Sequence, residues 1–331
     1  MKKLICLFLA LGVLFSLAAC QVDTVIGPEE VTTKRVGEDD LAGAIGQLNL
    51  DPGALEDEAM KAALQRMLEQ GVTLPVDEPP PETMPPPMPT GVPIRAEDVY
   101  PLMEKTRDIF NSGTYTFKAR GSSPPSPGMP IGTTPITFAV DKGQSAFEAQ
   151  MDWTSMARAM AEPGTQEYSM AVINGATMTT FFGKKVRFVT KPEGSVVLFL
   201  DKKSYFAMPG DEEGGESAFG IGNMFGDMFK PDTQGTVTAS KVTDGGKEYL
   251  CGETKSEGGQ LFYYFLDGQL KRIEMKVLNP EEGKTETFVF EVDLLTNTVD
   301  ASMFSTAGYK PITVDEFTQM GEGGLSGLFG G

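Results

Sequence analysis

Hydrophobic and polar residues alternate along most of the chain from position 114 to position 293, which is the pattern of half-buried β-strands. Thr114 to Arg120 shows it clearly, because Tyr115, Phe117 and Ala119 alternate with polar neighbours. The same alternation predicts further strands at 136–140, 147–153, 168–173, 176–182, 186–190, 195–200, 204–208, 236–242, 248–253, 260–266, 269–278 and 285–293. We therefore expect a meander of roughly a dozen antiparallel strands.

Short turn sequences separate several of these strands. Asn174-Gly175 and Asp267-Gly268 are two-residue hairpin signals, since both residues tolerate positive φ angles, and Asp141-Lys142-Gly143 is a further turn. An open sheet of this size has to curl, split or close. The pattern thus indicates a curved sheet or an unclosed barrel.

Only one long helix is expected in this part of the chain. Between Ala96 and Asn111 the apolar residues form a single stripe, and Gly113 follows as a stop signal. The predicted fold class is mainly β (α+β): a curved antiparallel sheet or unclosed β-barrel with a long N-terminal helix. One helix cannot cover so many strands, so two interiors stay open, a filled core and an apolar cavity on the concave side.

The N-terminus has the pattern of a bacterial lipoprotein signal. Met1-Lys2-Lys3 is a short positive segment, 4–15 is apolar, and Leu17-Ala18-Ala19-Cys20 forms a lipobox. An apolar run of about a dozen residues is too short to span a bilayer, for which ~20 residues are needed. We therefore expect cleavage of residues 1–19, lipidation of Cys20 with acyl chains such as palmitate, and an extracytoplasmic protein anchored to the cell membrane. An ordinary secretory signal is the alternative.

The remaining cysteines do not allow an intramolecular disulfide in the mature chain. Cys6 leaves with the signal and Cys20 becomes the lipidated residue, which leaves Cys251. Cys251 alternates in phase with Tyr249 in a strand-like run. A buried small apolar residue is therefore the expected role of Cys251, with a reactive thiol as the alternative.

Composition divides the rest of the chain. Residues 20–74 form an acidic tether with one amphipathic helix, expected between Pro52 and Gln70, and 75–95 is a proline-rich linker of polyproline II type. The β domain follows at 96–318, interrupted by a glycine-rich insertion at 209–231, and 319–331 is a glycine-rich tail. The linker is expected to act as a semi-rigid spacer, with a ligand for a proline-reading domain as the alternative.

Negative charge concentrates in these appendages. The net charge is −18, and acidic residues gather in the tether, the insertion and the tail. Nucleic-acid binding is not expected, because neutralising phosphates requires a basic face. Glu38-Asp39-Asp40 and Asp211-Glu212-Glu213 lack the spacing of a calcium-binding loop, so solvated acidic loops are the expected interpretation.

Catalytic chemistry has little support. The chain contains no histidine, which excludes Ser-His-Asp and Cys-His catalysis and imidazole metal sites. No phosphate-binding loop and no Cys-x-x-Cys motif occurs. Two carboxylate pairs, Asp141 with Asp152 and Glu248 with Glu253, stay open as acid–base groups. We expect neither an enzyme nor a cofactor or metal.

The order of the elements resembles the LolA/LolB lipoprotein-sorting superfamily over residues 96–318. The resemblance rests on the helix followed by Ser112-Gly113-Thr114-Tyr115-Thr116-Phe117, and on the ending Val299-Asp300-Ala301-Ser302-Met303-Phe304 with Gly308-Tyr309. It implies an unclosed barrel with helices over an apolar cavity. It also implies candidate cavity residues, which otherwise belong to an ordinary core: Phe117, Phe138, Phe147, Met151, Phe188, Phe262, Tyr264 and Phe290. The lipid anchor and the long tether depart from soluble carriers of this superfamily.

The glycine-rich insertion interleaves glycine with large apolar residues. We hypothesise a movable lid over the cavity, or a contact for membrane or partner, with an ordinary loop as the alternative. The candidate lid residues are Phe219, Ile221, Met224, Phe225, Met228 and Phe229.

Two functions follow from these expectations. The first is an anchored lipoprotein that binds a lipid, an acyl chain or another apolar ligand in the curved sheet. The second is an interaction or envelope-sensing module that uses the same sheet as a platform for another envelope protein and binds no lipid.

Overall fold

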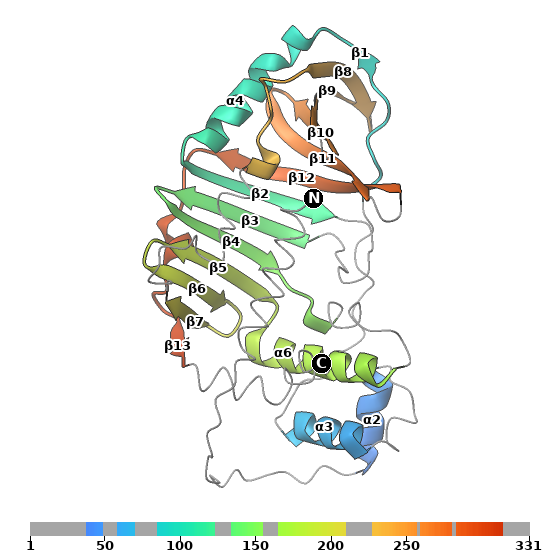
Figure 1. The fold of residues 1–331 in the computed structure, drawn as a ribbon, viewed down its shortest axis with the longest axis vertical. Coiled ribbons are helices and arrows are strands. Elements are labelled where there is room, and N and C mark those ends of the chain that lie inside the picture. The colour runs from blue at the N-terminus through green and yellow to red at the C-terminus, as the bar shows by residue number, and fades with distance from the viewer. Residues whose placement is uncertain are drawn as a thin grey trace.

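A thirteen-stranded mixed sheet that does not close dominates the structure, a computed structural model that describes residues 38–48, 58–69, 85–122, 134–154, 165–209, 227–256, 259–279 and 283–313. The strand order is β1-β8-β9-β10-β11-β12-β2-β3-β4-β5-β6-β7-β13, and the sheet runs along the length of the molecule (Figure 1). The mainly β class expected from the sequence is therefore confirmed.

Neighbouring strands pair in antiparallel fashion, except that β13 runs parallel to β7 at one edge. β12 pairs with β2 and thereby joins the N-terminal and C-terminal strands in one sheet. The strands span Val92–Pro93 (β1), Thr114–Ser122 (β2), Thr134–Asp141 (β3), Gln144–Gln150 (β4), Lys185–Lys191 (β5), Gly194–Phe199 (β6), Ser204–Pro209 (β7), Val237–Asp244 (β8), Lys247–Ser256 (β9), Gly259–Leu266 (β10), Gln269–Asn279 (β11), Lys284–Thr296 (β12) and Lys310–Ile312 (β13).

Two of the expected turns are present. Lys142 and Gly143 connect β3 to β4, with φ angles of 50° and 86°. Asp267 and Gly268 connect β10 to β11, with φ angles of 51° and 73°. Both positions are positive-φ turns of the kind that two-residue hairpins require.

The long helix expected over Ala96–Asn111 is not supported as a single element. A three-residue 3₁₀ turn, η2, spans Ala96–Asp98, and the α-helix α4 spans Tyr100–Asn111. Pro101 lies at the start of α4 because proline fits only the first helical turn. The helix is therefore shorter than the apolar stripe suggested.

The hairpin expected around Asn174-Gly175 is wrong, because residues Gln166–Phe182 form one helix, α6. Thr165 caps its N-terminus by accepting the Tyr168 amide, and Gly183 ends it with a φ angle of 74°. Gly175 lies at a close contact: a Cβ there would come within 2.7 Å of Thr154 Cα. Gly175 therefore allows α6 to pack closely against residues 153–154 and does not form a turn.

β4 likewise ends earlier than expected. Its last residue is Gln150, so Met151 and Trp153 lie beyond the strand on the way to α6. Trp153 is buried, and its indole N–H donates to the Gly183 carbonyl at 2.6 Å. This bond fastens the segment after β4 to the end of α6.

Two helices from the N-terminal region pack beside α6 (Figure 1). The amphipathic helix expected within 52–70 is confirmed as α3, Glu58–Glu69. The acidic loop expected at Glu38-Asp39-Asp40 is wrong, because these residues begin the helix α2, Glu38–Leu48. Carboxylates suit a helix N-terminus, where they face the positive end of the helix dipole. The buried residues of this three-helix cluster are Leu41, Ala44, Ile45, Leu64, Val172, Ile173 and Ala176.

The two faces of the sheet carry different clusters. The inner face is the one that bears Phe117, Phe138, Phe147 and Phe188, which are cross-strand partners on β2 to β5. Side chains from α4, α6 and Phe229 cover it. The opposite, outer face is covered near β3 to β7 by the 3₁₀ helix η3, Ala301–Phe304. Both faces are therefore buried over much of the sheet.

The described end of the proline-rich linker lies against the sheet. β1 pairs with β8, and the Ile94 amide donates to the Ala239 carbonyl at 3.0 Å. Residues 75–84 of the linker lie outside the described part of the chain.

Candidate functional site

Six of the eight candidate cavity residues come together on the inner face. Each lies in or against one apolar cluster that also includes side chains of α4 and α6; the six are Phe117, Phe138, Phe147, Met151, Phe188 and Phe290. Their rings pack closely, as in the Phe147–Phe188 pair, whose centroids are 6.4 Å apart. These six candidates therefore lie in or against one packed cluster together with further side chains.

Phe229 is a buried member of this cluster. Its ring lies 5.1 Å from that of Phe117 and 4.7 Å from that of Phe290, and only 1% of the residue is exposed. Phe229 belongs to none of the strands, since it comes from the end of the glycine-rich insertion. A ring from outside the sheet therefore packs on the inner face over the neighbouring strands β2 and β12, against Phe117 and Phe290.

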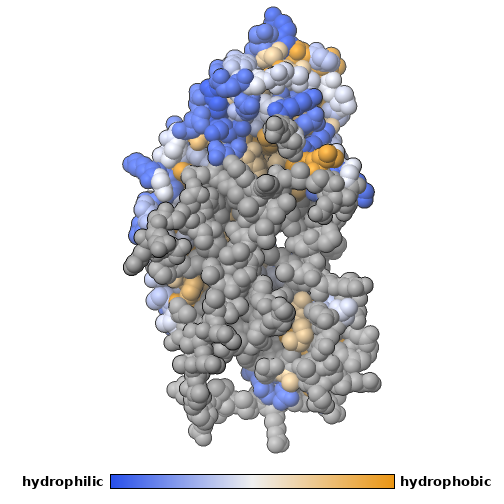
Figure 2. Space-filling model, in the orientation of Figure 1, coloured by the Kyte–Doolittle hydropathy of each residue, from blue (hydrophilic) through white to orange (hydrophobic). Residues whose placement is uncertain are grey.

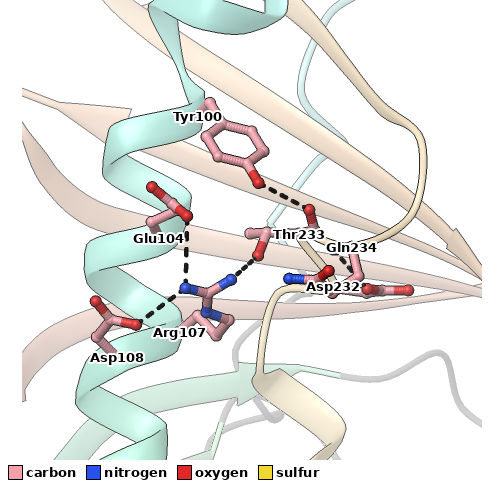
Figure 3. A network of polar contacts seen from close by, with 7 residues as sticks. All are labelled: Tyr100, Glu104, Arg107, Asp108, Asp232, Thr233 and Gln234. Atoms are coloured by element: carbon pink, nitrogen blue, oxygen red, sulfur yellow. Dashed lines mark hydrogen bonds and ion pairs between the residues drawn. The ribbon is translucent and has the colours of Figure 1, made fainter.

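A network of polar contacts joins the residues that follow Phe229 in the chain to α4 (Figure 3). The Arg107 guanidinium donates to the Thr233 hydroxyl, and the Tyr100 hydroxyl donates to the Thr233 carbonyl at 3.0 Å. Arg107 also makes ion pairs with Glu104 at 3.5 Å and with Asp108 at 3.2 Å. Thr233 is therefore the point at which this segment is held against the helix.

Of the candidate lid residues, only Met228 and Phe229 lie within the described residues. Met228 is partly buried against the same inner-face cluster as Phe229. Phe219, Ile221, Met224 and Phe225 lie outside the described residues, as does Cys20.

Phe262 and Tyr264 lie on the outer face, so the structure does not place these two candidates with the others. β10 alternates without interruption, because Leu261, Tyr263 and Phe265 pack with the inner-face cluster whereas Phe262 and Tyr264 pack with the other one. On the outer face Tyr264 pairs with Arg272 and Phe262 with Glu274. The expectation took the opposite phase, and an error of one residue in phase exchanges the two faces of a strand. Every residue from Leu261 to Leu266 is apolar or aromatic, so alternation alone could not reveal the exchange.

A buried polar group that the sequence analysis missed surrounds these two residues. Arg272 and Glu274 form an ion pair with a distance of 2.7 Å, and their side chains are 10% and 1% exposed. The Tyr264 hydroxyl donates to the second oxygen of Glu274 at 3.4 Å. The alternation of Arg272, Glu274 and Lys276 with apolar residues on β11 was the available signal, because it marks one face of that strand as polar.

Cys251 is buried beside this group, as expected for a structural residue. It is 3% exposed, and burial raises the pKa of its thiol to about 12. Burial also raises the pKa of Tyr264, its cross-strand partner. A protonated thiol is a poor nucleophile, so the geometry does not support reactivity at Cys251.

The two candidate carboxylate pairs are not brought together. Asp141 pairs with Gln144 at the start of β4, whereas Asp152 lies beyond its other end, and β4 itself is roughly 20 Å long at the usual strand rise. Glu248 and Glu253 are separated by an odd number of positions on β9, so their side chains point to opposite faces. Within the described ranges, no group of three or more His, Cys, Asp and Glu residues is placed to hold a metal ion.

A groove of about 440 Å³ lies along α4, lined in part by Glu104, Asp108, Ile109 and Asn297. None of the candidate cavity residues lines it. Figure 2 shows that hydrophilic residues dominate the surface around α4, while an apolar patch reaches the surface over the ends of β11 and β12. The groove is therefore a solvent-facing feature, distinct from the inner-face cluster.

The described helices do not include one that is both long and apolar enough to cross a membrane. No family model and no curated protein matches the chain. Among solved structures, an uncharacterised conserved protein from Thermus thermophilus is similar over 63% of this chain and 96% of its own, at 9% identity. The TM-score of 0.27 is too low to support an argument about fold or function.

Proposed function

We propose that this chain is a membrane-anchored extracytoplasmic lipoprotein that binds a lipid, an acyl chain or another apolar ligand on the inner face of its curved sheet. The lipobox that ends at Cys20 supports the anchor. Phe229 is the observation that carries the binding proposal, because an apolar group from outside the sheet already occupies the place between Phe117 and Phe290. A LolA-like arrangement is part of the proposal and rests on the order of elements alone.

The exchange of Phe229 for a ligand is energetically reasonable. Truncation of a buried phenylalanine typically costs about 3–5 kcal/mol, and each buried methylene group contributes about 0.8 kcal/mol. About four to six methylene groups of an acyl chain therefore offset the packing of the Phe229 ring. If the hydrogen bonds of Thr233 to Arg107 and Tyr100 persist, they keep the displaced segment near α4. If they break, the segment is released.

The test is the binding of a fluorescent long-chain fatty acid to the full chain and to two phenylalanine variants. Phe229→Ala should raise the affinity by up to roughly a hundredfold, because a ring worth about 3 kcal/mol no longer competes and 1.4 kcal/mol corresponds to tenfold. Phe304→Ala is the matched control, since Phe304 is 7% exposed but belongs to the outer-face cluster. Equal affinity of the two variants, or no binding to any of the proteins, contradicts the proposal.

The close packing of the inner face favours a second candidate function. Phe110, Tyr115 and Phe117 also pack against one another there, with centroid distances of 5.2 Å and 6.0 Å from the Phe110 ring. A face that is filled by its own side chains suits an interaction or envelope-sensing module that carries no lipid. A lipid-free chain that captures a defined envelope protein would support this second function.

A further inference from the structure

Residues 86–94 run over the outer face and then along the edge of β8, where β1 pairs with it. Met88 packs against the cluster of Val242, Cys251 and Tyr264. Further along, Val92 pairs with Lys241, Pro93 pairs with Ser240, and Ile94 donates to the Ala239 carbonyl. The segment therefore joins an apolar contact on the face to an added strand at the edge, a combination used in peptide recognition.

Two buried charges bind the backbone of this segment. The Glu274 carboxylate accepts the Met88 amide at 2.9 Å, and the Arg272 guanidinium donates to the Pro86 carbonyl at 2.5 Å. Both side chains are at most one-tenth exposed. Buried charges require hydrogen-bond partners, and the segment supplies one partner to each of them.

One further donor of this pair is left without a partner. Within the described part of the chain, Arg272 Nε is buried and makes no hydrogen bond. Such groups are uncommon in folded proteins. The sheet and the segment together therefore still leave one donor of the Arg272–Glu274 pair without a hydrogen bond.

The sequence of the segment matches this surface. Pro86, Pro87 and Pro89 have no amide hydrogen, so the Met88 amide that Glu274 accepts is the one donor between Pro86 and Pro89. At Gly91, a Cβ would come within 2.7 Å of Ser240 Oγ and Val242 Cγ2. The surface thus fits a segment in which prolines flank one backbone amide donor, Met88, and in which glycine follows at position 91.

We propose that the outer face of β8 to β11 is a binding site for an extended proline-rich peptide, and that residues 86–93 of this chain fill it in cis. The site lies on the opposite face from Phe229 and does not depend on apolar-ligand binding. Its consequence is that the linker is fixed to the β domain at Met88, so that residues 86–95 do not serve as a free spacer.

Competition with a labelled synthetic peptide of residues 84–95 tests the site in the full chain. Gly91→Leu should expel the segment and open the site, so this variant should bind the peptide at least tenfold more tightly than the wild type. The wild-type site stays filled, because a segment attached by a short link has an effective concentration in the millimolar range. Gly43→Ala is the control, since a Cβ at Gly43 meets nothing within 4 Å.

Adding Glu274→Ala to Gly91→Leu should abolish the peptide binding. Absence of binding to Gly91→Leu, equal binding to the wild type, or binding that survives Glu274→Ala would each overturn the proposal. Hydrogen exchange of the wild type gives a result that needs no variant. The Met88 and Ile94 amides should exchange at least tenfold more slowly than the Thr90 amide, and rapid exchange at Met88 would also overturn the proposal.

Discussion

The close contact between α6 and the segment after β4 makes Gly175→Ala an informative perturbation. In an exposed helix interior, replacing glycine by alanine stabilises a protein by about 1 kcal/mol. At Gly175 the added Cβ would lie 2.7 Å from Thr154 Cα and 2.8 Å from the Trp153 carbonyl oxygen. These are backbone atoms, so α6 has to move by roughly 0.8 Å to restore ordinary van der Waals contact.

Overpacking of this kind costs about 1–3 kcal/mol and outweighs the gain in helix propensity. The movement also loosens Met178 and Phe182, which join α6 to the inner-face cluster. We expect Gly175→Ala to lower the free energy of unfolding by up to about 2 kcal/mol, since the propensity gain offsets part of the cost.

Urea denaturation followed by tryptophan fluorescence measures this effect directly. Trp153 is the only tryptophan of the chain, and it is buried against the end of α6. Gly43→Ala in α2 has the same gain in helix propensity without a clash. The midpoint of its urea unfolding transition should therefore stay unchanged or move to a higher urea concentration. A Gly175→Ala protein that is stabilised as much as Gly43→Ala would refute the contact between α6 and residues 153–154.

Four further predictions concern other parts of the chain. Arg272→Ala should destabilise the protein by about 3–5 kcal/mol in thermal or urea unfolding because Glu274 is left buried and unpaired, whereas replacing both residues by Leu should cost less; equal losses would contradict this. Leu64→Ala should cost about 2–5 kcal/mol in the docking of α3 on α6, seen as faster hydrogen exchange in α3; unchanged exchange would argue against that docking. Because burial raises the pKa of Cys251 from 9.0 to about 12, the folded state keeps a proton that the unfolded state loses above pH 9. The free energy of unfolding should therefore fall between pH 9 and pH 12. In urea titrations at a series of pH values, the free energy of unfolding of Cys251→Ala should fall less steeply than that of the wild type. Cys20→Ser should move the protein from the membrane fraction to the soluble fraction, and persistent membrane association would contradict lipid anchoring.

Alternation predicted most of the strands because one face of each strand is apolar and the other is at least partly polar. β2 to β5 illustrate this, with Phe117, Phe138, Phe147 and Phe188 in cross-strand contact. The same criterion failed at α6, where residues 168–182 contain no charged side chain and period-two and helical patterns look alike. The capping residue Thr165 and the stop at Gly183 carried the helical signal.

The candidate site was predictable only in part, for a related reason. The inward side of β10 carries Leu261, Tyr263 and Phe265, and a run made entirely of apolar and aromatic residues does not reveal which alternate set faces inward. The pairing of Met88 with Glu274 joins positions 186 residues apart, so no local pattern could indicate it. Phe229 was foreseen as a candidate lid residue, but its place between Phe117 and Phe290 required the fold.

Native mass spectrometry of the full chain, extracted from membranes in mild detergent, tests the central claim most directly. The account predicts bound lipid beyond the acyl chains attached at Cys20, in an amount that increases for Phe229→Ala and stays unchanged for Phe304→Ala. Wild-type and Phe229→Ala proteins that both carry only their covalent acyl chains would contradict it.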